Sequence, residues 1–262
     1  MPLKKLIWLE LCGCSGNFIS FLNCTTPSFD VLTSQYINLS YSNSHTIPYG
    51  NYAMDLLFKT INEGNYILVI EGAVSTRDNG VYNIIGYHNG KPITGLEAAK
   101  VAGENAEYII AAGTCASFGG VSAAPPNLSG SVPVSDILGN KVIRMPTCPV
   151  SGDWMSSLIL NLIDGKKIDY DSLNRPIYLY GITIHDNCPR RSYFDKKIFA
   201  KHIGEITCMF KLGCKGPVTK TPCPVTRWNG FINWPVGANT PCIGCANSNF
   251  PNKDFFTGRK NK

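Results

Sequence analysis

Hydrophobic and polar positions follow two different periods along the first two thirds of the chain. Continuous apolar runs such as residues 66–74 are typical of strands that are buried on both faces of a sheet. Other segments, such as residues 52–64, space their apolar positions as a helix does and end at glycine. The runs predict strands in residues 5–11 and 66–74, and a strand followed by a loop in residues 107–116 and again in residues 141–149. The helical pattern predicts helices in residues 17–23, 52–64, 95–106 and 153–165.

The order of these elements predicts the fold class. Strands that alternate with helices imply a parallel sheet with right-handed crossovers. From about residue 180 the chain becomes rich in Pro, Gly, Asn and Cys, and few further strands or long helices are expected. We therefore expect an α/β parallel-sheet domain over residues 1–180, followed by a cysteine-rich, loop-dominated domain over residues 181–262.

Composition and charge narrow the function classes. Charged residues make up 16% of the 262 residues, which suggests that a partner covers much of the surface. The net charge of +6 is mild, and no basic stripe for nucleic acid is visible. No apolar run is long enough to span a membrane, and the first residues show neither a twin-arginine pair nor a cleavage site. These features predict a cytoplasmic protein without a membrane span of its own.

Eleven cysteines are the most unusual feature of the composition. A secreted disulfide framework would call for a signal peptide and usually for an even number of cysteines. In a reducing compartment, many cysteines more often mean ligands of a metal or an iron–sulfur cluster. The cysteine count therefore favours a metalloprotein.

Three of these cysteines, Cys14, Cys115 and Cys148, each follow a predicted strand. Ligands of an open parallel sheet bind beyond the carboxyl ends of its strands, so three residues far apart in sequence would converge on one edge. For a single cysteine, burial in the core is the simpler interpretation. Three cysteines at strand ends, flanked by Gly and Pro, favour a shared ligand site.

The last third carries too little regular structure to fold by packing alone, and metal clusters would supply the missing cross-links. Its candidate ligands suit one group of three cysteines plus a histidine and one group of three cysteines. They are His185, Cys188, Cys208, Cys214, Cys223, Cys242 and Cys245. Zinc is the alternative, because CIGC at residues 242–245 has zinc-knuckle spacing, but a second such pair is missing.

With these cysteines and the motifs around them, the chain resembles the small, electron-transferring subunit of nickel–iron hydrogenases. The resemblance runs nearly from end to end, from WLELCGCSGN to CANSNF. The motifs that carry it are EGAV at residues 71–74, GTCASFGG near 114, PTCPVSGDW at 146–154, HDNCPRRSYFD at 185–195, CMFKLGCKGP at 208–217 and WNGFINWPVGANTPCIGCANSNF at 228–250.

The resemblance implies a flavodoxin-like first domain and three iron–sulfur clusters. His185, Cys188, Cys208 and Cys214 would hold a distal 4Fe–4S cluster, with one imidazole in place of a thiolate. Cys223, Cys242 and Cys245 would hold a medial 3Fe–4S cluster. Cys14, Cys115 and Cys148 match three of the four ligands of a proximal cluster, and Cys24 matches no ligand.

The fourth proximal ligand departs from the family pattern. Most relatives have two cysteines separated by two residues in the opening motif, which would place the first of them at Leu11. Cys12, one residue on, could still reach a 4Fe–4S cluster, because one step of chain covers about 3.8 Å and Gly13 could redirect the loop. Alternatively, the corner is vacant and the site holds 3Fe–4S, or Cys12 only packs or senses redox state.

The function that the resemblance implies is an electron relay. Hydrogen would be oxidised or evolved at a nickel–iron site in a separate large subunit, and this chain would hold no catalytic residue. Electrons would pass through the three clusters to an unidentified acceptor, and the heterodimers would form a higher oligomer. The alternatives are a hydrogen-sensing regulatory subunit, a quinone-reductase-like electron subunit, which would match only the first domain, and a zinc scaffold.

Overall fold

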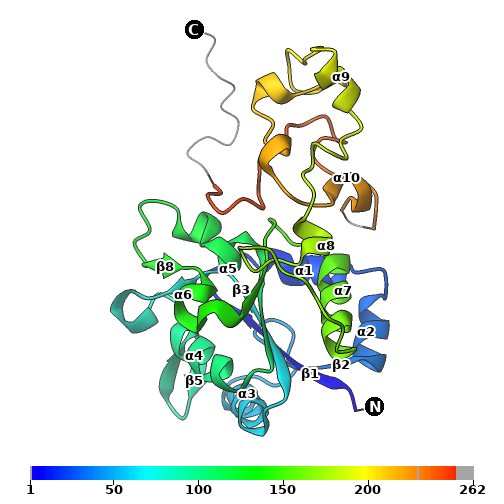
Figure 1. Cartoon of the computed structure of the whole chain (residues 1–262). Coiled ribbons are helices and arrows are strands. Elements are labelled where there is room, and N and C mark those ends of the chain that lie inside the picture. Colours follow the sequence, from blue (N-terminus) through cyan, green and yellow to red (C-terminus); the bar gives the residue numbers. More distant parts are fainter. Residues whose placement is uncertain (1, 229, 252–262) are drawn as a thin grey trace.

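Five parallel strands form the central sheet of this computed structural model, which describes residues 2–228 and 230–251 (Figure 1). Across the sheet their order is β2–β1–β3–β7–β9, and every neighbouring pair is parallel. Counted in chain order this is 2-1-3-4-5, the order of flavodoxin-like sheets, so the predicted fold class is confirmed. The strands are β1 (Lys4–Glu10), β2 (Ile37–Ser42), β3 (Tyr66–Glu71), β7 (Tyr108–Ala112) and β9 (Val142–Met145).

Alternate residues of each strand supply two cores, one on each face of the sheet. Leu6 and Trp8 of β1 face the core beneath α1 (Gly16–Leu22), α2 (Phe29–Gln35) and α7 (Gly152–Ile163). Ile7 and Leu9 face the opposite core beneath α3 (Asn51–Glu63), α4 (Gly95–Asn105) and α6 (Val134–Leu138). This period of two explains why the buried strands read as continuous apolar runs.

Most of the predicted elements are confirmed, with shifts of a few residues at their ends. The predicted strand 66–74 is interrupted at Gly72 and resumes as β4 (Val74–Ser75), which pairs with β8 (Ser131–Val132). The sequence pattern does not predict strand β2, helix α2 or the hairpin of β5 (Ile84–His88) and β6 (Lys91–Thr94). Cys115 lies on a short helix, α5 (Gly113–Phe118), rather than in a loop.

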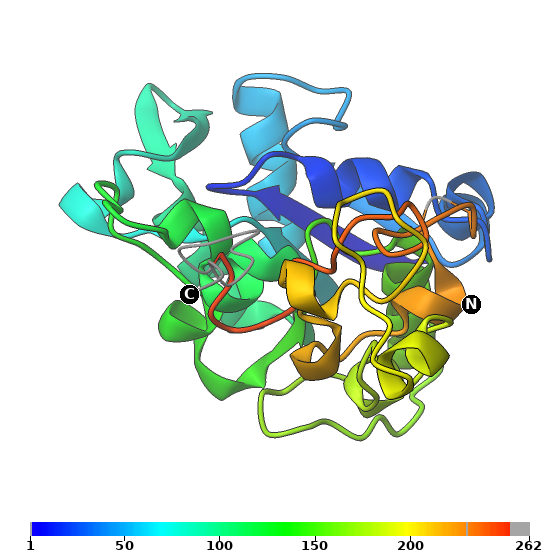
Figure 2. The same ribbon diagram turned by 90° about the horizontal axis from the view of Figure 1, so that it is seen from above.

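The cysteine-rich part stands over the carboxyl ends of the strands and is built from short pieces (Figure 1). Seen from that end, it covers part of the sheet domain and leaves the β5–β6 hairpin uncovered (Figure 2). Its described helices are α9 (Arg191–Asp195) and α10 (Cys223–Thr226), which follow α8 (Ile177–Tyr180). The short 3-10 turns of the chain are η1 (Arg77–Gly80), η2 (Gly120–Ala123), η3 (Gly139–Lys141), η4 (Phe210–Leu212) and η5 (Gly216–Val218).

The core beneath α1 and α7 continues into the cysteine-rich part. Tyr180, Ile184, Trp234 and Val236 belong to the same buried cluster as the strand residues. The division of the chain near residue 180 therefore stays a prediction. In the described part of the chain, no helix combines the length and the apolar character that crossing a bilayer requires.

Candidate functional site

Three thiols meet at the carboxyl edge of the sheet. We call them the proximal group: Cys14, in the loop between β1 and α1, Cys115 on α5, and Cys148, three residues after β9. Burial is the larger cause that raises the pKa of Cys148 to about 11, and the neighbouring thiols of Cys115 and Cys14 add to it. Cys14 and Cys148 are nevertheless solvent-exposed in this chain. The structure thus brings together the three cysteines expected at strand ends.

Asn17 ties the loops that carry the proximal group to one another. Its side-chain Nδ2 donates to Oε1 of Glu71 at 3.0 Å, and its Oδ1 accepts from the backbone N–H of Val150 at 2.8 Å. Gly113 is the third neighbour, because a Cβ placed there would come within 2.5 Å of the Asn17 amide. One buried side chain therefore holds the loops after β1, β3, β7 and β9 in a fixed relation.

Glu71 ends β3 with no exposed surface, and its carboxylate anchors the start of α1. It accepts from the backbone N–H groups of Asn17 and Phe18 at 2.8 and 2.9 Å, and from Trp8 Nε1 at 3.2 Å. Carboxylates stabilise helix N-termini in this way. Burial nevertheless raises the pKa of Glu71, because desolvation outweighs the effect of these hydrogen bonds.

Two glycines allow the backbone to approach the proximal group closely. Gly72 has φ +90°, and a Cβ there would lie 2.6 Å from the carbonyl carbon of Cys12. Gly120 has φ +50°, and its Cβ would lie 2.8 Å from the backbone nitrogen of Cys115 and 3.0 Å from the sulfur. Any side chain at either position would displace the loop that carries a candidate ligand.

Cys12 lies two residues before Cys14 and forms an isolated bridge. Its backbone forms an antiparallel bridge with Ala73, with N–O distances of 3.1 and 3.0 Å. Leu11, which takes the place of the family's first cysteine, is 7% exposed and packs into the core against Gly95. The thiol of Cys12 follows directly on that buried position, and its role as fourth ligand stays a prediction.

The distal group gathers in the cysteine-rich part. Its members, His185, Cys188, Cys208 and Cys214, line one cavity together with Met209, Phe210, Gly216 and Pro217. Burial is the main cause that lowers the pKa of His185, with a further contribution from the Arg191 charge. The neutral imidazole that can ligate a metal is therefore favoured.

Arg190 is a buried cation at the wall of this cavity. Its guanidinium donates to the carbonyls of Glu205 and Thr207 at 2.9 and 3.0 Å, and to the side chain of Asn239. Burial raises the pKa of Cys188 and Cys208, and the Arg190 charge partly offsets this effect. The cation would favour negative charge on a group held by these thiols.

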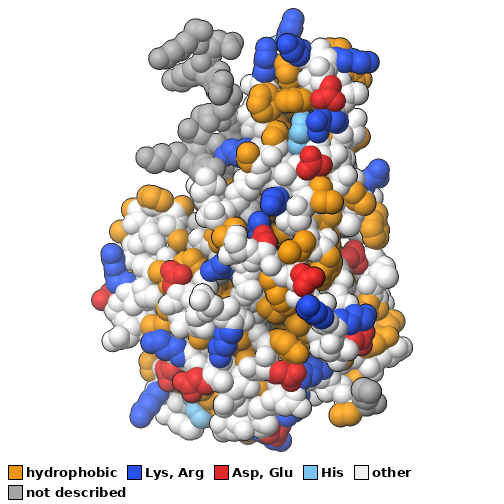
Figure 3. Space-filling view, in the orientation of Figure 1, with side chains coloured by type: hydrophobic (Ala, Val, Ile, Leu, Met, Phe, Trp, Pro, Cys, Tyr) orange, Lys and Arg blue, Asp and Glu red, His pale blue; other side chains and the backbone are white. Residues whose placement is uncertain are grey.

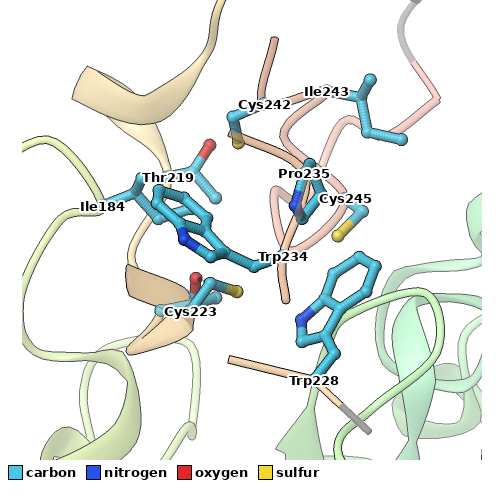
Figure 4. A pocket seen from close by; sticks show the side chains of 10 residues that line it. Ile184, Thr219, Cys223, Trp228, Trp234, Pro235, Cys242, Ile243 and Cys245 are labelled. Carbon is cyan, nitrogen blue, oxygen red and sulfur yellow. Dashed lines mark hydrogen bonds between the residues drawn. The ribbon is translucent and has the colours of Figure 1, made fainter. Parts of the chain in front are cut away.

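The medial group, Cys223, Cys242 and Cys245, lines a second cavity (Figure 4). Trp228, Trp234, Pro235 and other mostly apolar residues complete its wall, and the two indoles lie beside the thiols. Thr221 Oγ1 donates to the sulfur of Cys223 at 3.1 Å, and the N–H of Gly244 donates to Cys242 at 3.4 Å. Burial raises the pKa of Cys242 to about 12.

Direct contacts join the three groups in a row. Thr114, one residue before Cys115, donates to the Cys245 carbonyl, and the backbone of Cys148 lies close to the thiol of Cys245. At the other end, Cys242 lies near Cys214, and the N–H of Lys215 donates to the Cys242 carbonyl at 2.8 Å. Proximal, medial and distal groups are thus neighbours in that order.

The donor sets fit iron–sulfur clusters. Soft thiolates with one imidazole suit iron–sulfur chemistry, and the raised thiol pKa values mean that these groups stay neutral unless a cation compensates their charge. Within residues 2–228 and 230–251, no three His, Cys, Asp or Glu side chains are placed to share a single metal ion. A polynuclear cluster spreads its ligands around several iron atoms, whereas a zinc site converges on one.

Comparisons with known proteins agree with this geometry. Residues 14–162 match the family model of the 20 kDa subunit of NADH ubiquinone oxidoreductase, and residues 180–257 match that of the C-terminal part of the NiFe/NiFeSe hydrogenase small subunit. The chain is 37% identical to the quinone-reactive Ni/Fe-hydrogenase small chain of Wolinella succinogenes, over 94% of this chain and 71% of that relative. The chain belongs to the nickel–iron hydrogenase small-subunit family.

Other relatives support the assignment. The protein is 34% identical to the periplasmic NiFe hydrogenase small subunit 1 of Nitratidesulfovibrio vulgaris, over 94% of this chain and 79% of that one. It superimposes with a TM-score of 0.92 on a chain of the NiFeSe hydrogenase from Desulfovibrio vulgaris Hildenborough, at 32% identity and with 98% of both chains covered.

These relatives correct the expected location. The prediction of a cytoplasmic protein is wrong, because the relative from Wolinella succinogenes is named quinone-reactive and that from Nitratidesulfovibrio vulgaris is named periplasmic. The physical reason lies in the cysteines themselves. Thiols that are committed as cluster ligands do not pair as disulfides, so their number says little about the redox state of the compartment.

Sequence reasoning missed the residues that support the ligands. Asn17 holds loops and Thr221 donates toward a thiol, and each lies two or three residues from a candidate ligand. A polar residue so near a ligand in sequence is a candidate supporting residue, but the spacing alone does not distinguish a supporting side chain from a solvated one. The match to the hydrogenase small-subunit model covers residues 180–257. A quinone-reductase-like protein would lack this part of the chain.

Proposed function

We propose that this hydrogenase small subunit relays electrons between the nickel–iron site of a large subunit and an external carrier. The observation that carries the proposal is that the proximal, medial and distal groups lie side by side in that order. Cys245 links the first two groups, and the neighbouring Cys242 and Cys214 link the last two. A row of neighbouring redox sites is what successive single-electron steps require.

The proposed ligand sets follow the three groups. The distal group would hold a 4Fe–4S cluster and the medial group a 3Fe–4S cluster. The proximal group would hold 4Fe–4S if Cys12 is the fourth ligand and 3Fe–4S if that corner is vacant. When bound, the clusters supply the one-electron redox chemistry, and the protein sets their position and potential.

The protein tunes each site differently. The indoles of Trp228 and Trp234 exclude water from the medial cavity, and the N–H of Gly244 donates toward its sulfur. At the distal cavity, the Arg190 charge and a neutral imidazole at His185 both reduce net negative charge. Less negative charge and more hydrogen bonds to sulfur raise a cluster's potential.

The large subunit would cover the proximal group. Cys14 and Cys148 are exposed in this chain, whereas the medial thiols are buried. The loop after β2 is joined to the carboxyl end of β1, since Asn43 bonds the backbone of Glu10, and it presents Ile47 and Tyr49 with 95% and 85% exposure. Exposed apolar residues around a redox site indicate a surface that another protein buries.

Purification of the chain together with its large subunit tests the relay. We expect iron, acid-labile sulfide and hydrogen-dependent reduction of benzyl viologen. Cys148→Ala should lose iron from the proximal group and most of the activity. Cys24→Ala is the matched control, because Cys24 is a buried cysteine outside the three groups, and it should keep the full iron content. A complex without iron and sulfide would refute the proposal.

Electron paramagnetic resonance of the oxidised complex, with spin counting, addresses the proximal cluster. One 3Fe–4S signal is the expected result if Cys12 ligates, and Cys12→Ala should then create a second. Two 3Fe–4S signals in the unmodified complex would instead establish the vacant corner.

A further inference from the structure

We propose that the end of the molecule around His185 docks a small, soluble electron-carrier protein with an acidic surface. The inference rests on the proposed function, because it assigns the chemical class of the external carrier. The docking surface consists of exposed residues around α9 and the loop that follows it, and we call it the basic pole. Its members are Lys196, Lys197, Ile198, Lys201, Ile203, Ile206, Phe210 and Lys211.

Charge is distributed unevenly between the two parts of the chain. Residues 1–180 contain 11 Lys and Arg against 14 Asp and Glu, whereas residues 181–251 contain 9 against 3. The positive charge therefore belongs to the cysteine-rich part. Lys and Arg side chains gather with hydrophobic ones at this end of the molecule (Figure 3).

The three acidic residues of this part are all engaged. Asp195 accepts from Arg191 Nε at 3.0 Å, and Asp186 accepts from the Thr183 hydroxyl at 2.6 Å. Glu205 accepts from the backbone N–H groups of Lys201 and His202 at 3.1 and 3.0 Å. These carboxylates hold loops in place and do not neutralise the neighbouring lysine side chains.

The lysines of the basic pole present their charge to solvent. Lys196, Lys197 and Lys201 are exposed and form no ion pair with any described residue. Lys211 lies over the ring of Phe199, 5.0 Å from its centroid. An uncompensated positive field of this kind attracts an acidic partner and raises its association rate.

An aromatic cluster connects the distal group to the same surface. The ring of Phe194 packs edge-on against His185, with 4.5 Å between ring centroids, and Phe210 packs against Phe194 at 5.3 Å. Phe210 also lines the distal cavity and is 45% exposed. A carrier that covers Phe210 would therefore lie next to the candidate ligand His185.

The mixture of charge and scattered apolar residues fits a transient protein partner. Interfaces of electron-transfer encounters are small, and charged residues steer them. Attachment to a lipid surface commonly uses an amphipathic helix, but the longest described helix of the cysteine-rich part, α9, has five residues. Each docked carrier would take one electron, so two dockings would remove the two electrons that one H2 releases with its two protons.

The test uses the complex with its large subunit under hydrogen, at slightly alkaline pH, and two one-electron carriers. An acidic plant-type 2Fe–2S ferredoxin should be reduced faster than a basic mitochondrial-type cytochrome c at low salt. Raising NaCl from about 0.01 to about 0.5 M should slow ferredoxin reduction about tenfold or more, because it screens the charges. Viologen reduction by the unmodified complex shows separately whether the proposed function holds.

Lys196→Glu combined with Lys201→Glu should slow ferredoxin reduction about tenfold at low salt. Lys100→Glu combined with Lys167→Glu is the matched control, because it reverses the same number of exposed lysines on the sheet domain and should change no rate. Iron content and the thermal midpoint verify that both variants fold.

Three results would overturn the basic pole as the docking surface. They are equal ferredoxin rates in the two double variants, a salt-independent ferredoxin rate, or faster reduction of cytochrome c. Binding to vesicles that contain phosphatidylglycerol, lost in the pole variant alone while the ferredoxin rate is unchanged, would assign the surface to a membrane. If viologen reduction is absent, the proposed function fails. The basic pole is then tested by titrating the complex with ferredoxin in a calorimeter and measuring whether it binds.

Discussion

At the scale of single residues, the protein depends on buried polar side chains next to candidate ligands. Asn17 and Glu71 are both buried, and their hydrogen bonds connect the ends of three strands, β1, β3 and β9. A buried polar group that loses its partner costs about 1–3 kcal/mol, so these bonds specify the loop arrangement strongly. They hold in place the loops that carry the proximal group.

Asn17→Asp should selectively weaken the proximal site. The carboxylate would still accept from Val150, but it would lose the donor to Glu71 and place two carboxylates side by side. We expect a loss of about 1–3 kcal/mol of stability and reduced iron in the proximal group, measured by the thermal midpoint and by iron analysis. Asn23→Asp, an exposed asparagine at the end of the same helix, is the control. Equal iron in the two variants would contradict the positioning role of Asn17.

Glu71→Gln should alter the pH dependence of stability. Because burial raises the Glu71 pKa above its usual 4.5, the folded state binds more protons than the unfolded state in the window above that value. The contribution of Glu71 therefore falls as pH rises through this window. Glutamine does not ionise. Its NH2 group cannot accept hydrogen bonds, so donors that face one of the two carboxylate oxygens of Glu71 would lose their acceptor. The thermal-midpoint advantage of the unmodified complex should be largest near the bottom of the window and shrink above it, and a pH-independent difference would refute this.

At the scale of elements, the segments that follow β1 and β3 approach each other so closely that no side chain fits between them. Gly72 follows β3 directly, and its backbone lies against Cys12 and Gly13 in the loop after β1. The break at Gly72 also explains why the predicted single strand over residues 66–74 divides into β3 and β4. This contact fixes the backbone of Cys12 at the carboxyl edge of the sheet.

Gly72→Ala should therefore lower the stability of the protein by more than the cost of the positive φ angle alone. The methyl group would meet the Cys12 backbone at 2.6 Å, in addition to the cost of about 1–2 kcal/mol for a residue with positive φ. Gly64→Ala isolates the second term, because Gly64 has φ +66° and no atom within 4 Å of an added Cβ. We expect a lower thermal midpoint and less proximal iron for Gly72→Ala than for Gly64→Ala. Identical behaviour would show that the loop after β1 can move away.

At the scale of the whole molecule, two kinds of stabilisation divide the chain. The sheet domain has two apolar cores, whereas residues 181–251 are held by short turns, isolated bridges and the surroundings of the medial and distal groups. Cluster binding would then contribute to the folding of this part. Some of its residues, such as Trp234 and Val236, still pack against the sheet domain.

Removal of iron should consequently affect the two parts unequally. After oxidation and chelation, we expect proteases to cleave within residues 181–251 first, while the sheet domain persists. Mass spectrometry of the fragments over time gives the order of cleavage. The complex kept anaerobic without chelator is the control, and simultaneous cleavage of both parts would mean that packing alone holds the cysteine-rich part.

The sequence by itself determined the parallel-sheet class, most of the strands and helices, and the family. Apolar periodicity follows from which faces are buried, so the run from Leu6 to Leu9 is enough to assign a strand. The sequence also proposed the ligand candidates, because thiols at strand ends and in a segment poor in regular structure have few other uses. The hairpin β5–β6 and strand β2 escaped prediction, since partly exposed strands lack a continuous apolar run.

Only the tertiary structure decided which cysteines share a cavity and in what order the three groups touch. Contacts such as Cys148 with Cys245 join residues far apart in the chain, and no local pattern encodes such a distance. The same holds for Asn17, whose partners lie 54 and 133 residues away, and for the engagement of every acidic residue near the basic pole. Local periodicity reports burial, whereas convergence depends on how the whole sheet and its loops pack.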